Sequence, residues 1–291
     1  MPNLYVTPTE IKNALPDVVR SATTDYDNIL LQLANRVSRW IENYCNQSFY
    51  PLVDTRYYDG RGNNQLWIDP IISITGLEYS EDDGDSYAAV DENTDYVATR
   101  AGNHNSAKSH NLLIVHPNST NIDIFVAGFL SIKIAGVWGY ADDRDDCWED
   151  SQDSVQDEAG INASVTSVTV SDADGADLMG FTPRFQAGQL IKIEDEYLEI
   201  ASISTDTLTV VRGRNGSAAA EHAKDKTIYI WRPPEAVKQA CIIQSARQWK
   251  RGMQGFSDAE ANPELGQLFY LKALDPEVQS MLEVYRVRAV G

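Results

Sequence analysis

The spacing of apolar residues predicts two helices near the start of the chain. Thr7 and Glu10 form the signature of a capping box, so a short helix is expected to begin there and to end at Pro16. Asp25 is expected to cap a longer helix that ends near Asn46. Apolar residues recur along it at steps of three and four, which predicts an apolar stripe wide enough to pack on two sides. They are Tyr26, Ile29, Leu30, Leu33, Ala34, Val37, Trp40, Ile41 and Tyr44.

From about residue 52 the apolar period changes to two, the period of a β-strand. Residues 141–160 carry nine acidic side chains, one basic side chain and few apolar ones, which predicts a linker. Beyond it, five short alternating segments predict a small all-β module over residues 161–230. The helical period returns at about residues 233–252 and 275–285.

This layout predicts an α+β fold. Neither helical end has enough residues to fold alone, so residues 1–146 and 231–291 are expected to form one helical bundle core with a β-hairpin or strand extension. An acidic linker is expected at 147–160. Residues 161–230 are expected to form an inserted all-β domain, either a small barrel or a sandwich.

Composition and charge exclude several classes of protein. The 291 residues carry a net charge of −19, and a chain this acidic is not expected to coat DNA, whose affinity for proteins comes from Lys and Arg. No apolar run is long enough to span a membrane, and the first residues lack the pattern of a signal peptide. Three widely spaced cysteines fit neither a disulfide framework nor a zinc site, so a reducing compartment is expected.

The candidate chemical motifs are weak, and no catalytic, metal or cofactor-binding residues are predicted. His104, His110 and His116 recur every six residues, which does not bring three ligands to one helix face. The acids of 172–177 lack the later glutamate of a calcium loop and are interpreted as a turn, with a weak cation site left as the alternative. The acids of 194–196 are interpreted as a solvated hairpin turn. Four tryptophans near the predicted domain junctions indicate either core packing or an interface: Trp138, Trp148, Trp231 and Trp249.

The order of several motifs resembles the head-to-tail connector (adaptor) proteins of tailed bacteriophages. The likeness covers about 1–140 and 231–291. The segments that carry it are 5–11, 40–49, 55–60, 132–140, 234–237 and 274–278. The predicted insert departs from this family, although 188–193 and 211–217 resemble a β module that recurs in phage tail-associated proteins.

The resemblance implies a structural virion protein at the head–tail interface, assembled in the host cytoplasm and without enzymatic activity. Its copies would form a ring, usually dodecameric, between the portal protein and a tail or head-completion protein, and DNA would pass through without specific binding. In the connector proteins the C-terminal segment docks on the portal, and the resemblance places this segment at about residues 275–291 of this chain. Its expected contact residues are Val278, Met281, Leu282, Tyr285, Arg286 and Arg288.

Two other functions stay open on the sequence. Residues 161–230 could be a glycan- or protein-binding module carried on a helical scaffold, and exposed aromatic residues on that module would favour this reading. The module offers Phe181, Phe185, Tyr197 and Tyr229 for this purpose. A hydrolase that uses the acids between 172 and 199 is the third alternative.

Overall fold

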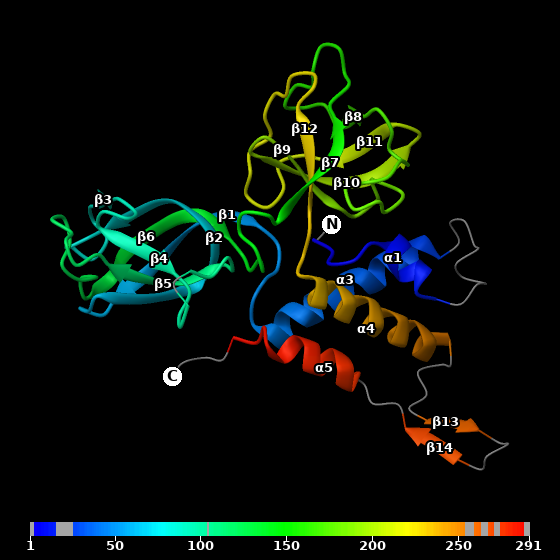
Figure 1. Cartoon of the computed structure of the whole chain (residues 1–291), viewed down its shortest axis with the longest axis horizontal. Coiled ribbons are helices and arrows are strands. Elements are labelled where there is room, and N and C mark those ends of the chain that lie inside the picture. Colours follow the sequence, from blue (N-terminus) through cyan, green and yellow to red (C-terminus); the bar gives the residue numbers. More distant parts are fainter. Residues whose placement is uncertain are drawn as a thin grey trace.

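The structure, a computed structural model, describes residues 3–15, 26–103, 105–253, 259–262, 267–270 and 274–287. Four helices lie within these ranges, and each terminal part of the chain contributes two of them (Figure 1). They are α1 (Pro8–Asn13), α3 (Asp27–Cys45), α4 (Glu235–Met253) and α5 (Pro276–Glu283).

Local sequence signals set the helix ends. The Thr7 hydroxyl accepts a hydrogen bond from the Glu10 amide at 3.2 Å, and the Glu10 carboxylate accepts one from the Thr7 amide at 2.8 Å. The predicted capping box is therefore confirmed. The predicted end of the second helix is also confirmed, because Asn46 follows α3 with a left-handed φ of 53°. Pro16 and Asp25 lie outside the described residues.

Residues 52–138 form a first antiparallel sheet in the order β1-β6-β2-β5-β4, with β3 paired to β2. The long strand β2 changes partner along its length, pairing with β5 at its start and with β6 from Ile71 onward. Trp138, Leu113 and Phe125 are among the buried residues of this sheet's own core. The strands are β1 (Leu52–Gly60), β2 (Gln65–Tyr79), β3 (Ala88–Val90), β4 (Tyr96–Thr99), β5 (His110–Val115) and β6 (Gly128–Trp138).

Residues 148–231 form a second antiparallel sheet in the order β7-β12-β9-β10-β11-β8. Its separate core is made mainly of aliphatic residues, which alternate along β9, β10, β11 and β12 and also come from the segments between strands. The strands are β7 (Trp148–Ser154), β8 (Ser167–Thr169), β9 (Leu190–Ile193), β10 (Glu196–Ser204), β11 (Thr207–Val211) and β12 (Thr227–Trp231). A two-stranded hairpin of β13 (Ala259–Asn262) and β14 (Gln267–Tyr270) lies between α4 and α5.

The predicted helical bundle core is wrong. The two six-stranded sheets dominate the fold, and each has its own hydrophobic core, so the first sheet is a separate packed unit and not an extension of the helices. The predicted acidic linker at 147–160 is also corrected, because it contains β7, which pairs with β12. Asp153 of this strand is buried, and its carboxylate accepts hydrogen bonds from the Ser171 and Asp172 amides and from Arg184.

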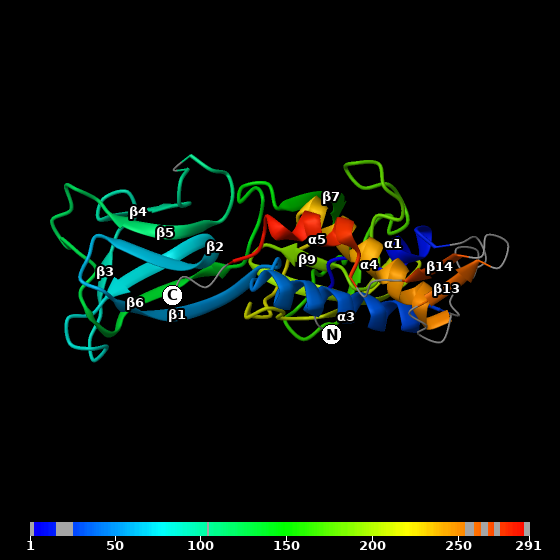
Figure 2. The ribbon, with the colours of Figure 1, turned by 90° about the horizontal axis from the view of Figure 1, so that it is seen from below.

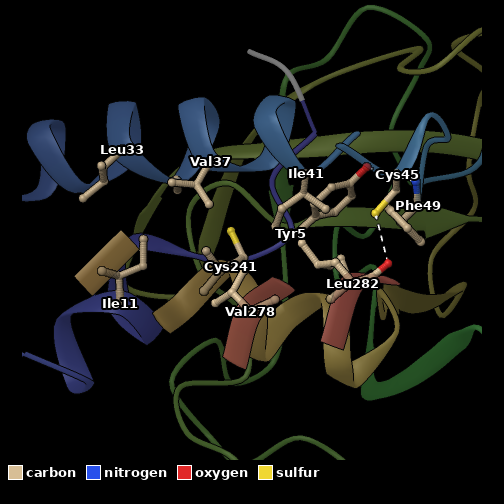
Figure 3. Close-up of a cluster of buried hydrophobic side chains, with 14 of the residues drawn as sticks. Tyr5, Ile11, Leu33, Val37, Ile41, Cys45, Phe49, Cys241, Val278 and Leu282 are labelled. Carbon is tan, nitrogen blue, oxygen red and sulfur yellow. Dashed lines mark hydrogen bonds between the residues drawn. The ribbon is translucent and has the colours of Figure 1, made fainter. Parts of the chain in front are cut away.

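The helices from both ends of the chain share one core. Figure 3 shows side chains of α3, α4 and α5 pointing toward one another, with Val37, Ile41 and Cys241 near the centre. Tyr5 and Ile11 of the N-terminal segment belong to the same cluster. The helical part is therefore built from segments that lie about 190 residues apart in the sequence.

The two sheets and the helices contact one another at one junction. The Trp231 indole donates to the Phe49 carbonyl at 3.1 Å, and the Val53 amide donates to the Asn215 carbonyl at 2.9 Å. Trp148 packs on Trp231 with ring centroids 5.2 Å apart. Trp138 lies instead in the first sheet's core. Core packing therefore explains Trp231, which is buried, and Trp148, which is partly buried against it. In Figure 2 the first sheet lies at one end of the long axis and the helices lie toward the other.

Candidate partner-binding surfaces

The predicted portal-docking helix α5 turns its apolar face inward. The Asp275 side chain caps it by accepting from the Glu277 amide at 2.9 Å, and Asp275 also pairs with Arg247 of α4 at 2.5 Å. Val278 and Leu282 are completely buried against α3 and α4. In this conformation these two residues cannot contact a partner, which corrects the role that the sequence suggested for them.

Two more of the predicted docking residues, Tyr285 and Met281, contact other residues of the same chain. Tyr285 packs on Phe49 and Tyr140 with ring centroids 5.6 and 5.4 Å apart, and its hydroxyl donates to Asp142 at 3.0 Å. Burial raises the pKa of Tyr285, so the phenol stays a neutral donor. Met281 is partly buried on the same helical core.

The free surface at the end of α5 is small and mixed. Val284 is 78% exposed and Val287 is 41% exposed, and the Arg286 guanidinium lies 5.5 Å from the centre of the Tyr44 ring. These three residues line a hollow of about 440 Å³ that reaches Trp67 and Pro70 of β2, which we call the α5 hollow. Arg288 lies outside the described residues.

A second concave surface lies on the first sheet, where β1, β2 and the start of β6 meet. Its volume is about 720 Å³, and three exposed aromatic side chains line it: Tyr57, Trp67 and Phe129. We call this surface the aromatic groove. Arg61 and Asp59 also line it, and the Asp59 carboxylate accepts from the Leu130 amide at 2.8 Å.

Hydrogen bonds fix the wall of the aromatic groove. The Tyr58 hydroxyl donates to Asp69 at 3.1 Å, and Arg56 pairs with the same carboxylate at 2.8 Å. Arg56 also lies 4.4 Å from the centre of the Trp138 ring. These contacts join β1 to β2 across the gap between them, so the groove is formed before any partner arrives.

A third surface is an apolar loop at residues 177–181 of the second sheet's domain, which we call the apolar loop. Leu178, Met179 and Phe181 are 56%, 68% and 65% exposed. Three large apolar side chains exposed within four residues are unusual on a surface that contacts only water. The other aromatic residues considered for this module give a glycan site less support, because Phe185 and Tyr197 are buried and Tyr229 is only partly exposed.

The acidic turn at 194–196 is a structural ion cluster. Glu196 is buried and accepts hydrogen bonds from Arg212, from His222 and from the Gly213 and Ala220 amides. Burial alone would raise the pKa of Glu196, but these donors lower it to about 2. The pairing explains Glu196 without a catalytic role.

The other candidates for chemistry are also held in structural contacts. Burial raises the pKa of the Cys45 and Cys241 thiols to about 12 and that of Cys147 to about 11, which disfavours the reactive thiolates. Asp177 of the weak calcium pattern pairs with Arg232 at 2.6 Å. Across the part of the chain that the structure describes, no group of three or more His, Cys, Asp or Glu residues is arranged to hold a metal ion.

Buried His110 should make the first sheet less stable in acid. Burial lowers its pKa to about 4, with a further contribution from Arg144, whereas an unfolded histidine titrates near pH 6.5. Below about pH 6.5 the unfolded chain therefore binds a proton that the folded chain does not. Stability is full above this pH and falls by up to about 3 kcal/mol by about pH 4.

Urea unfolding of the wild type and of His110→Gln at several pH values checks this expectation. The free energy of unfolding of the variant should depend less steeply on pH between about 6.5 and 4. Parallel pH profiles for the two proteins would mean that His110 does not carry the effect.

No described protein family matches this chain, and no curated protein matches it. None of the helices within the described ranges is long and apolar enough to cross a membrane.

Neither the aromatic groove nor the apolar loop is predicted as a surface from the sequence, although Phe181 was considered there for a glycan site. Trp67 carried a usable signal, because β2 alternates exposed and buried positions from Gln65 to Asp69. Its neighbour Phe129 comes from the start of β6, and no local pattern links the two residues. The apolar loop carried a signal as well, because Leu178 and Met179 lie between turn residues and outside any alternating strand.

Proposed function

We propose that the chain is a subunit of the adaptor ring that joins the portal of a phage head to the tail. In this role it is a structural virion protein without enzymatic activity, and DNA passes through the ring without specific binding. The proposal of a portal as neighbour follows from the resemblance of the terminal segments to phage connector proteins. The net charge of −19 also supports it, because an acidic wall does not retain DNA.

The observation that carries the ring is the presence of two different apolar surfaces on one chain. The aromatic groove lies on the first sheet and the apolar loop lies in the second sheet's domain. A subunit that uses two unlike surfaces makes head-to-tail contacts, and such contacts close into a ring when the rotation between subunits fits. A second copy, a portal and a tail-side protein are the partners proposed here.

The free end of α5 is the proposed portal contact. Val284, Arg286 and Val287 are exposed and line the α5 hollow, whereas Val278 and Leu282 support the same helix from inside. A basic residue between two apolar ones suits an acidic portal surface with apolar pockets.

Mixing the full chain with the portal protein of the same phage tests this function. Native mass spectrometry should show several copies of the chain on one portal ring. Arg286→Glu should weaken the complex by about 10-fold or more, because it reverses the charge at the contact. Met253→Glu is the control, because Met253 is 73% exposed at the end of α4 and away from the α5 hollow. A chain that stays monomeric and does not bind the portal would contradict the proposal.

A further inference from the structure

The apolar loop is held in one shape before it meets a partner. The Asp177 carboxylate accepts hydrogen bonds from the Met179 amide at 3.0 Å and from the Phe181 amide at 2.8 Å. The second carboxylate oxygen of Asp177 pairs with Arg232 at 2.6 Å. The backbone amide of Asp177 donates to the Phe181 carbonyl at 2.9 Å. A loop fixed in this way loses little conformational entropy when its apolar side chains are buried by a partner.

The aromatic groove offers the apolar loop a concave surface with aromatic walls. It is concave, and its volume of about 720 Å³ lies within the range of pockets that bury whole side chains. Tyr57, Trp67 and Phe129 give it apolar walls, and buried aromatic residues are the commonest anchors of protein interfaces. A projecting group of Leu, Met and Phe side chains suits such a surface, because thioether and ring edges pack well on aromatic faces.

The aromatic groove presents one exposed base to the acids beside the apolar loop. Asp172 and Asp174 are exposed beside the apolar loop, and Arg61 is exposed at the aromatic groove. Two acids also lie at the groove, where the Asp59 carboxylate accepts from the Leu130 amide and the Asp83 carboxylate accepts from the Phe129 amide. Lys238 lies 6.0 Å from the Phe181 ring and pairs with Glu10, which leaves the acids as the main free charge on the loop side.

The two surfaces do not meet within one chain. The groove is lined by residues of the first sheet. That sheet lies at one end of the long axis, apart from the second sheet, whose domain carries the loop (Figures 1 and 2). All six of their large apolar side chains remain about half exposed or more. Contact between them therefore requires a second copy of the chain.

We propose that the apolar loop of one subunit inserts into the aromatic groove of the next subunit. This contact is heterologous, so each chain gives its loop to one neighbour and receives a loop from the other. The inference rests on the proposed ring and names the surfaces that join its subunits. Met179 and Phe181 act as the anchors on one side, and Trp67 acts as the anchor on the other.

Two variants with complementary defects test the contact. Met179→Glu has a damaged loop and an intact groove, whereas Trp67→Ala has a damaged groove and an intact loop. Each variant alone should lose self-association by about 30-fold or more, which is typical of removing an interface anchor. Mixed in equal amounts, they should form a heterodimer and nothing larger, because only one loop and one groove are intact. Native mass spectrometry distinguishes this dimer from monomers and rings.

Met253→Glu is the matched control for the loop variant. It introduces the same charge in place of the same residue type at similar exposure, 73% against 68%, and it should assemble like the wild type. Circular dichroism of every variant shows whether its fold is intact. If both complementary variants assemble normally, or if the folded variants give no heterodimer when mixed, the proposed contact is wrong.

Assembly on the portal separates this inference from the proposed function. With Gln65→Cys at the groove and Leu178→Cys in the loop of one chain, the anchors Trp67, Met179 and Phe181 stay in place, and oxidation of the portal-bound ring should link neighbouring subunits through these two positions. The three native cysteines are buried and do not compete. A portal-bound ring without these crosslinks overturns the loop-to-groove contact alone, whereas failure to bind a portal at all overturns the proposed function.

Discussion

Replacing Arg212 by Ala is expected to destabilise the second sheet by about 3–5 kcal/mol, because it leaves a buried carboxylate without its main partner. Both oxygens of Glu196 accept from the Arg212 guanidinium, at 2.7 and 2.6 Å, and the Glu196 side chain is fully buried. Arg212 also donates to the carbonyls of Asn162, Val165 and Ala220. Its removal therefore leaves three carbonyl oxygens and one carboxylate short of donors.

The remaining donors to Glu196 do not replace the guanidinium. His222 lies 2.9 Å from Glu196 and 2.8 Å from Glu194, so its ring is shared between two acids. In the wild type Glu196 is ionised at pH 7, because its pKa is about 2. Without Arg212 the carboxyl group either keeps a buried negative charge or takes up a proton, and both outcomes cost stability. Arg212→Lys should recover part of the loss, since an ammonium restores the charge but not the planar set of five donors.

Urea unfolding at pH 7 measures this effect, with Lys224→Ala as the control in the same sheet. Lys224 pairs with Glu158 at 2.5 Å, but Glu158 is largely exposed, so breaking that pair should cost far less than removing Arg212. Arg212→Ala and Lys224→Ala with similar midpoints of unfolding would show that the Glu196 cluster does not stabilise the sheet.

Local features of this fold could be predicted from the sequence, and distant ones could not. The capping box at Thr7 and the end of the second helix near Asn46 depend on residues within one turn, and both were predicted. The strand β7 was missed because Trp148–Ser154 is acidic and lacks clean alternation. Its pairing with β12 and the donors that satisfy Asp153 come from remote segments.

The helical bundle prediction failed for a similar reason. Amphipathic helices give strong periodic signals, so the terminal segments seemed to be the core of the chain, whereas the strands of 52–138 gave weaker signals one by one. These strands form a core only together, through long-range pairs such as β1 with β6. The aromatic groove belongs to the same class, because Trp67 and Phe129 become neighbours only once the sheet has formed.

The apolar face of α5 shows why such a face does not by itself indicate a docking surface. A short helix with one apolar stripe can place it on a partner or on its own protein, and both choices give the same sequence pattern. The structure places Val278 and Leu282 in the core that α3 and α4 build. Leu282→Ala should therefore lower the stability of the helical part by about 4 kcal/mol, since it removes a fully buried side chain and leaves a cavity.

Val284→Ala is the matched control on the same segment, because Val284 is 78% exposed and its loss should change stability by less than about 0.5 kcal/mol. Guanidinium unfolding followed by far-UV circular dichroism compares the two variants. The result also decides how a deletion of 275–291 is interpreted. If Leu282→Ala is costly, the deletion removes part of the core, and lost portal binding would follow from unfolding alone. If Leu282→Ala costs less than about 1 kcal/mol, α5 is not needed for the core, and its apolar face becomes available for the portal.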